Sequence, residues 1–252
     1  MGLLEDGEAP VYEVLREVGP SPFLLTADHA GRVIPRRLGD LGVSQAEMDR
    51  HIAWDIGIAE VTRRLSAALD ATAILQNYSR LVIDCNRNPG WASAFPEVSE
   101  ATAIPGNQGL DEAAKVARRE AIFEPYHRTI GRLVAVRART IYVAMHSFTP
   151  VYLGAARPMH VAVLYNRNPR LSKILADLLR ADGGLAVAEN APYRVSDETD
   201  YGVPVHAERN GLDYLELEIR QDLIADETGQ AEWAERLARL LPGALRQLEA
   251  RA

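Results

Sequence analysis

Short apolar runs along the chain alternate with longer segments whose apolar residues recur every three or four positions. The runs predict buried strands at about 22–27, 140–149, 160–165 and 185–188, and alternating apolar and polar residues predict a strand at 212–220. Helical spacing appears at 56–69, 111–137 and 171–180, and an amphipathic helix closes the chain. Strand then helix, repeated, predicts a three-layer α/β/α domain with a largely parallel central sheet. We expect residues 1–252 to form this one domain.

Three further stretches carry specific expectations. Residues 72–89 read as two strands separated by a turn near 77–79. Ser44 with Glu47 is a capping-box pattern, which predicts a helix running toward His51. On such a helix His51 and Asp55 would share one face, because they are four positions apart. Residues 91–109 show little periodicity and predict a long surface loop, of the kind that often covers a functional site.

Composition narrows the class of protein. The chain has 47% apolar and 25% charged residues, as ordinary globular proteins do, and a net charge of −7. That charge argues against a nucleic-acid partner. Neither a membrane-spanning apolar stretch nor a signal-peptide pattern is present, and a single cysteine allows no internal disulfide. We therefore expect a cytoplasmic protein with no membrane partner, whose oligomeric state, homo-oligomer or monomer, the sequence does not decide.

Two predicted strands each end in a histidine, His29 after 22–27 and His146 within 140–149. The carboxyl ends of neighbouring parallel strands meet at one edge of a sheet, where ligand sites are expected. For one such histidine alone, a hydrogen-bonded group at a strand end is the simpler interpretation. Two together predict a shared metal ion, and a catalytic zinc site needs a third ligand, for which Asp55 and His51 are both candidates.

A general base is expected on the last predicted strand. Glu216, Glu218 and Arg220 share one face of it by their parity. Surface exposure on an edge strand explains Glu216 well, whereas Glu218 lies between two apolar residues near the carboxyl end of the strand, where sites are built. We therefore expect Glu218 to be the base. Cys85 lies within an apolar run without an adjacent histidine and is expected to be a core thiol.

Arginines in the second half of the stretch 72–89 could form a pocket for an anion. Arg80, Asn86 and Arg87 carry planar donors suited to a substrate carboxylate. The alternative is an ion-pair network with Asp84, which could also hold one arginine in position. Two further residues complete the expected substrate-binding set, Ser147 and Arg220.

Six motifs in chain order resemble the N-formylglutamate amidohydrolase family, and they extend from residue 28 to 223: Asp28-His-Ala-Gly31, His51-Ile-Ala-Trp-Asp-Ile-Gly57, Ser79-Arg-Leu-Val-Ile-Asp-Cys-Asn-Arg87, His146-Ser-Phe-Thr-Pro150, Asn190-Ala-Pro-Tyr193 and Glu218-Ile-Arg-Gln-Asp-Leu223. The resemblance implies a phosphorylase/hydrolase-like α/β fold similar to zinc carboxypeptidases and aspartoacylases, with a mixed sheet of about eight strands. It also implies zinc-dependent hydrolysis of an N-acyl amino acid, above all N-formyl-L-glutamate to L-glutamate and formate, in amino-acid metabolism.

The resemblance also assigns roles to residues of this chain. His29 and His146 match the two metal histidines, Glu218 the catalytic glutamate and Asn86-Arg87 a substrate-binding pair. The carboxypeptidase pattern places a ligand glutamate three residues after the first histidine, but Arg32 stands there. Asp55 or His51 must then supply the third ligand. In the implied mechanism zinc activates a water, Glu218 takes its proton and passes it to the leaving nitrogen, and Arg80 and Arg87 hold a substrate carboxylate.

Three alternatives remain open at this stage. A cell-wall amidase would use the same zinc chemistry, but it would need export. A broader N-acyl amino acid amidase, similar to aspartoacylases, differs only in the acyl groups that it accepts. A non-catalytic metabolite-binding protein could keep the arginine pocket without the metal, and Arg32 in place of a ligand glutamate favours it.

Overall fold

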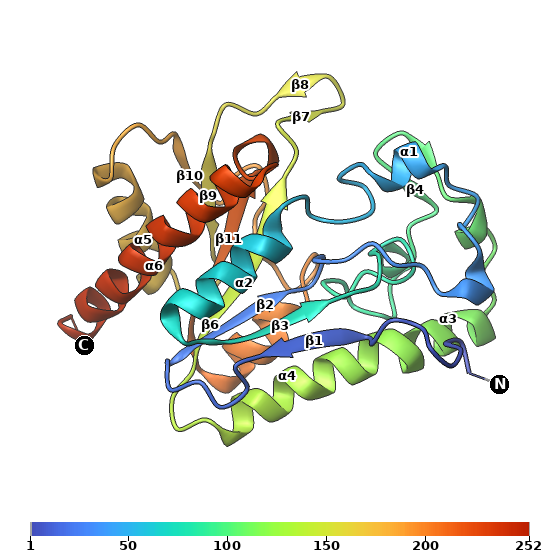
Figure 1. Cartoon of the computed structure of the whole chain (residues 1–252), viewed down its shortest axis with the longest axis horizontal. Helices are drawn as coiled ribbons and strands as arrows, with labels where there is room; N and C mark the ends of the chain where they lie inside the picture. The colour runs from blue at the N-terminus through green and yellow to red at the C-terminus, as the bar shows by residue number, and fades with distance from the viewer. Residues whose placement is uncertain (1, 252) are drawn as a thin grey trace.

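A seven-stranded sheet forms the centre of the computed structural model, which describes residues 2–251 (Figure 1). Its strand order is β1-β3-β2-β6-β11-β9-β10. The bounds are β1 Tyr12–Leu15, β2 Phe23–Ala27, β3 Thr72–Gln76, β6 Ile141–Phe148, β9 Val161–Leu164, β10 Val187–Glu189 and β11 Asp213–Arg220. Short hairpins are made by β4 (Val98–Ser99) with β5 (Thr102–Ala103), and by β7 (Val151–Tyr152) with β8 (Ala155–Ala156).

The sheet is mixed and mostly parallel. The strands β3, β2, β6 and β11 run parallel to one another, and so do β9 and β10. Antiparallel pairs join β1 to β3 and β11 to β9. The predicted class of sheet is confirmed, with seven strands in the main sheet of the described chain instead of about eight.

Helices cover both faces of the sheet and give three layers. On one face lie α2 (Ile58–Leu69), α5 (Arg170–Ala181) and α6 (Glu227–Glu249), which pack on Val143 and Met145 of β6. On the other face α3 (Glu112–Arg118), the π-helical turn η4 (Arg119–Phe123) and α4 (Glu124–Val136) follow one another, and apolar side chains of η4 and α4 pack with Tyr142 and Ala144. Because side chains alternate along a strand, His146 projects toward this second face.

Two predicted elements are absent from the described residues. The prediction of a second strand within 72–89 is wrong, because residues 80–87 form buried turns. Side chains, not a neighbouring strand, satisfy their backbone, since Asn107 donates to the carbonyl of Leu81 at 2.8 Å and Arg118 to that of Val82 at 3.0 Å. The helix expected to reach His51 is also wrong, because α1 spans only Gln45–Met48. Ser44 does cap α1, as the sequence predicts.

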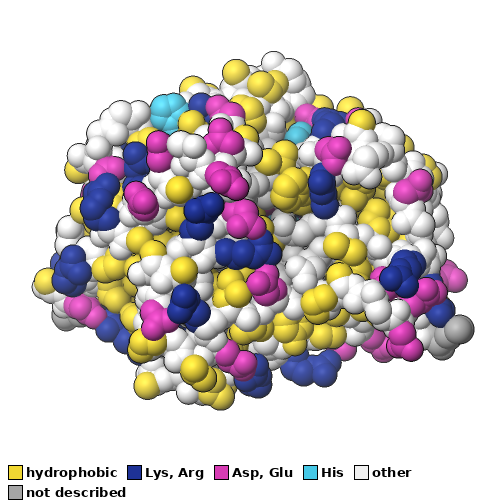
Figure 2. Space-filling model, viewed as in Figure 1, with side chains coloured by type: hydrophobic (Ala, Val, Ile, Leu, Met, Phe, Trp, Pro, Cys, Tyr) yellow, Lys and Arg dark blue, Asp and Glu magenta, His cyan; other side chains and the backbone are white. Residues whose placement is uncertain are grey.

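The surface of the molecule is mixed in charge. Over the face shown in Figure 2, acidic and basic side chains are interspersed and do not gather by sign. Among residues 2–251, no helix combines the length and the apolar character needed to cross a lipid bilayer.

Candidate active site

Parallel strands bring the predicted site residues to one edge of the sheet. His29 follows the end of β2, His146 lies in β6, and Glu218 lies in β11. In the ladder between β6 and β11, Glu218 is directly opposite His146. Their side chains share a face, because both strands alternate in register. The sheet therefore fixes the distance between a predicted metal ligand and the predicted base.

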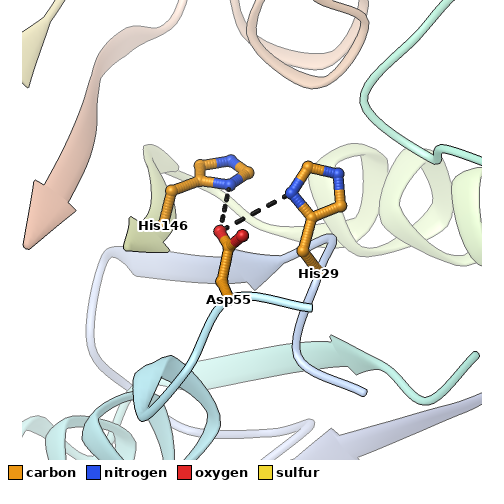
Figure 3. Close-up of side chains that lie close together, drawn as sticks. All are labelled: His29, Asp55 and His146. Carbon is orange, nitrogen blue, oxygen red and sulfur yellow. Dashed lines mark hydrogen bonds and ion pairs between the residues drawn. The ribbon is translucent and has the colours of Figure 1, made fainter. Parts of the chain in front are cut away.

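His29, Asp55 and His146 form a compact buried group (Figure 3), whose ligand atoms lie within 4.8 Å of one another. Oδ2 of Asp55 is 3.1 Å from Nδ1 of His146 and 3.6 Å from Nδ1 of His29. The structure does not bring His51 into this group: its Nε2 faces Glu100 at 3.6 Å. His51 and Asp55 diverge because they lie on turns and not on one helix. Of the two candidates for third ligand, Asp55 has the position.

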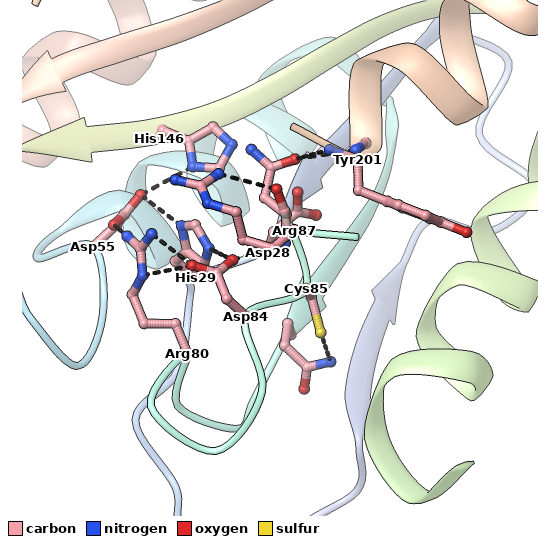
Figure 4. A network of polar contacts seen from close by, with 12 residues as sticks. Asp28, His29, Asp55, Arg80, Asp84, Cys85, Arg87, His146 and Tyr201 are labelled. Carbon is pink, nitrogen blue, oxygen red and sulfur yellow. Dashed lines mark hydrogen bonds and ion pairs between the residues drawn. The ribbon is translucent and has the colours of Figure 1, made fainter. Parts of the chain in front are cut away.

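Two histidine nitrogens of this group lack hydrogen-bond partners among residues 2–251 and are therefore free to bind a metal ion. Nδ1 of His29 and Nε2 of His146 are buried and have no hydrogen-bond partner within the described chain. The opposite nitrogen of His29 bonds to Oδ1 of Asp84 at 2.8 Å (Figure 4), an arrangement that orients metal-bound histidines in many proteins. Two imidazoles and one carboxylate form a donor set that zinc accepts.

Electrostatics tie the group together. Burial opposes charge on Asp55, yet the two histidines hold the pKa of this carboxyl well below its usual range. Burial and Arg80 act to lower the pKa of His29, but Asp84 and Asp55 raise it overall. Burial likewise opposes charge on His146, whose pKa is nevertheless raised to about 10, chiefly by its hydrogen bond with Asp55. The carboxylates therefore favour a positive charge at the two imidazoles, and a bound cation could supply it.

Backbone contacts position Asp55. Its N–H donates to the carbonyl of His29 at 2.9 Å, and its Oδ2 accepts from the N–H of Ser147 at 3.1 Å. Gly57 follows with φ of 80°, and a Cβ there would lie 2.1 Å from the carbonyl oxygen of Ile224. Arg32, the residue that departs from the carboxypeptidase pattern, pairs instead with Asp49 and stacks over Trp54.

Glu218 and Glu216 both point into the site and are 7% and 3% exposed. Burial raises the pKa of Glu218 to about 7 and that of Glu216 well above its ordinary value. In each, Oε2 has no hydrogen-bond partner among residues 2–251. A carboxyl group with a pKa near 7 is suited to accept and return a proton.

A cavity of about 650 Å³ opens in front of these groups. The residues predicted to bind substrate, Arg80, Asn86, Arg87 and Ser147, line it. Oδ2 of Asp84 accepts from Arg80 at 2.7 Å and 3.1 Å, so the predicted ion pair is present and orients Arg80. Burial acts against charge on Asp84, but Arg80 keeps its pKa well below the usual range.

Two of the predicted substrate-binding residues have their polar groups engaged by protein. The side chain of Asn86 accepts from the N–H groups of Tyr201 and Gly202 and donates to Asp200 at 3.1 Å. The hydroxyl of Ser147 donates to the carbonyl of Ile56 at 2.9 Å. These contacts give both residues a positioning role within the cavity wall.

Arg220 is not at the cavity, contrary to the prediction from strand parity. Its guanidinium pairs with Asp222 at 2.7 Å and donates to the carbonyls of 157–159. The reason is its place at the last position of β11, where the side chain bends around the end of the sheet. Arg157 and Tyr193 also line the cavity. Tyr193 closes one of the six family motifs but received no role from the sequence, and Arg157 lies in none of these motifs.

A buried group of two histidines and a carboxylate, with a protonatable glutamate beside it at the edge of an α/β sheet, is typical of hydrolases that use a metal ion. A family model described as N-formylglutamate amidohydrolase matches residues 21–225. The chain belongs to the N-formylglutamate amidohydrolase family and is thus an enzyme of a class that acts on amides.

Several solved structures are similar to this chain. A gene product of Agrobacterium tumefaciens is 38% identical, with a TM-score of 0.93 over 98% of this chain and 99% of its own. Two others are similar in fold. The N-formylglutamate amidohydrolase of Ralstonia eutropha is 18% identical, with a TM-score of 0.60 over 98% of this chain and 96% of its own. A bacteriophage poly-gamma-glutamate hydrolase is 12% identical, with a TM-score of 0.51 over 98% and 94%. The comparison with curated proteins finds no match.

Proposed function

We propose that the protein is a zinc-dependent hydrolase that cleaves the amide bond of N-acyl amino acids, with N-formyl-L-glutamate as the foremost substrate. The observation that carries this proposal is the buried group of His29, Asp55 and His146 directly beside Glu218. Membership of the N-formylglutamate amidohydrolase family supports the choice of substrate.

His29, Asp55 and His146 would hold the zinc ion. When bound, zinc polarises the amide carbonyl and lowers the pKa of water, which makes a nucleophile at neutral pH. Asp84 keeps a proton on Nε2 of His29 and so leaves Nδ1 free to act as a ligand. Asp55 in its turn is fixed by the backbone of Ser147.

Glu218 would move the proton in this reaction. It accepts a proton from the attacking water and donates it to the amide nitrogen as the C–N bond breaks, which releases the acid and the amino acid. Its pKa of about 7 matches both halves of this transfer. The burial of Glu218 keeps bulk water from exchanging that proton.

Arg87 and Arg80 would bind the α-carboxylate next to the scissile amide. Arg87 donates to the backbone carbonyls of Asn86 and Thr199, and pairs with no carboxylate of the described residues. Arg80 is oriented by Asp84 and lies 3.6 Å from Oδ1 of Asp55, close to the metal group. An anionic substrate would balance this charge.

A broader N-acyl amino acid amidase is the second candidate. The cavity of about 650 Å³ is large enough for a drug-sized ligand, so its size alone does not restrict the acyl group to formyl.

Metal content and an acyl panel test the proposal. Protein purified without chelator should carry about one zinc per chain by plasma mass spectrometry, and His146→Ala should lose it. N-formyl-L-glutamate should be hydrolysed faster than the N-acetyl and N-butyryl derivatives, whereas equal rates would favour the broader amidase. Absence of metal and of turnover after zinc reconstitution would refute the hydrolase and favour a metabolite-binding protein.

A further inference from the structure

Arg157 lies at the cavity on the segment that follows the β7–β8 hairpin, which projects beyond the sheet in Figure 1. Its guanidinium stacks over the ring of Tyr152 at 4.8 Å and that of Tyr193 at 4.9 Å. It also donates to the hydroxyl of Tyr193 at 2.8 Å. Aromatic stacking on its faces leaves the edge of the guanidinium for hydrogen bonds in its own plane.

This cation has no acidic partner. Arg80, at the same cavity, pairs with Asp84, whereas Arg157 forms no ion pair with any carboxylate of residues 2–251. Arg220 fixes the backbone beneath it, because its guanidinium donates to the carbonyls of Arg157, Pro158 and Met159 at 3.3 Å each. A charged group that is already oriented loses little freedom when it binds an anion.

The two arginines differ in their surroundings in the cavity wall. Arg80 lies 3.6 Å from Oδ1 of Asp55, whereas Arg157 is flanked by Tyr152 and Tyr193, which are 37% and 43% exposed. In an N-acyl glutamate the α-carboxylate is one carbon from the scissile nitrogen, and the side-chain carboxylate is further out. A substrate whose amide lay at the metal group would offer the nearer carboxylate to Arg80 and Arg87, which leaves Arg157 as a cation of the same cavity for the farther one.

We propose that Arg157, supported by Tyr193, binds the side-chain carboxylate of the substrate and thereby selects acidic over neutral N-acyl amino acids. This inference rests on the proposed function, and it assigns specificity to the hairpin segment and not to Asn86, whose side chain is engaged by the backbone of residues 201–202 and by Asp200.

A substrate pair isolates this contact. In Arg157→Gln, kcat/KM for N-formyl-L-glutamate should fall by about 10- to 100-fold, mainly through KM, as expected for loss of a charge-assisted hydrogen bond. N-formyl-L-glutamine lacks the side-chain carboxylate, so kcat/KM for this substrate should change by less than about threefold. For N-formyl-L-glutamate, kcat/KM should fall less in Arg157→Lys than in Arg157→Gln, because lysine keeps the positive charge. Arg128→Gln, on a side chain that is 75% exposed on α4, is the matched control and should behave as wild type.

An equal fall in kcat/KM for both substrates in Arg157→Gln would overturn the inference, as would an unchanged kcat/KM for both.

Calorimetric titration with L-glutamate and L-glutamine separates this failure from that of the proposed function. If wild type hydrolyses none of the substrates, the proposed function fails, and weaker binding of L-glutamate alone in Arg157→Gln would still support the inference. No binding of L-glutamate by wild type, or unchanged affinity in the variant, would overturn it.

Discussion

Glu216 and Glu218 are two buried carboxyl groups with raised pKa values on one face of one strand, and their neighbours separate their roles. Glu218 is opposite His146 in the ladder, whereas Glu216 is opposite Ala144, two residue pairs further from the carboxyl edge. Besides burial, the nearby charge that most raises the pKa of Glu216 is Asp200. Position thus favours Glu218 as the group that reaches the scissile amide.

Exchange of each glutamate for glutamine should therefore have unequal effects. Glu218→Gln should lower kcat by about 10²- to 10⁴-fold, because an amide cannot accept the proton, while zinc content stays as in wild type. Glu216→Gln should lose less than about tenfold if its carboxyl only shapes the cavity wall. Steady-state kinetics and metal analysis of both variants check this, and a larger loss in Glu216→Gln would reverse the assignment.

At the scale of elements, the buried turns of 80–87 depend on one cation. Arg118 at the end of α3 is buried and donates to the carbonyls of Val82 and Gly106, both at 3.0 Å, and to Asn107 at 2.6 Å. Burial without a carboxylate lowers the pKa of Arg118 to about 10. The turn segment that carries Arg80, Asp84 and Arg87 is thus held from behind by a helix.

Arg118→Met should destabilise the protein by about 2–3 kcal/mol, because it leaves buried carbonyls without donors. The neighbouring Arg119→Met removes a half-buried arginine that pairs with Glu124, and should cost less than about 1 kcal/mol. Urea unfolding of both variants gives the two free energies of unfolding. Equal values would show that the turns hold their shape without Arg118.

The end of α5 is joined to α6 by charge. Asp182 accepts from Arg236 at 2.8 Å and from Arg239 at 2.6 Å, and the hydrogen bond to Arg236 is the main cause that lowers its pKa. A carboxyl whose pKa falls on folding stabilises the protein above the unfolded pKa of about 3.9 and loses this effect as pH falls through the folded pKa.

Asp182→Asn should therefore cost about 0.5–1 kcal/mol at pH 7, and the difference from wild type should be smaller at pH 3, which lies below the unfolded pKa of about 3.9. Asp177→Asn, at a 73% exposed position one turn earlier on α5, is the control and should cost less. Thermal unfolding of the three proteins at both pH values tests the sign. A cost as large at pH 3 as at pH 7 would mean that Asp182 acts by packing and not by charge.

The pattern of apolar and polar residues predicted most strands and helices, because each kind of element has its own spacing of apolar residues and is bounded by turn residues. It placed His29, His146 and Glu218 at one sheet edge correctly, since strand ends are visible in a sequence. It failed at 80–87, where an apolar run forms buried turns. There, side chains distant in the sequence donate hydrogen bonds to the backbone carbonyls. It also failed for Arg220 and Arg157, because the direction of a long side chain at a strand end or beside a hairpin depends on contacts far along the chain.

At the scale of the whole molecule, a large apolar core packs on each face of the sheet. The fold should therefore persist without zinc, with a lower Tm. At a zinc concentration of about 1,000 Kd, binding adds about 4 kcal/mol, which for a protein of this size corresponds to roughly 10 °C. Calorimetry with and without chelator tests this in wild type and His146→Ala. An equal shift in both would place the zinc elsewhere.

The parallel pairing of β6 and β11 has a consequence for how the enzyme can diversify. His146 and Glu218 are joined by the hydrogen-bonded ladder at the centre of the sheet, so neither can shift without a change of strand register. The β7–β8 hairpin has no such tie to the sheet, and its tip is exposed. If Arg157, just after the hairpin, selects the substrate as proposed, exchange of this segment should change the substrate preference and leave His146 and Glu218 in place.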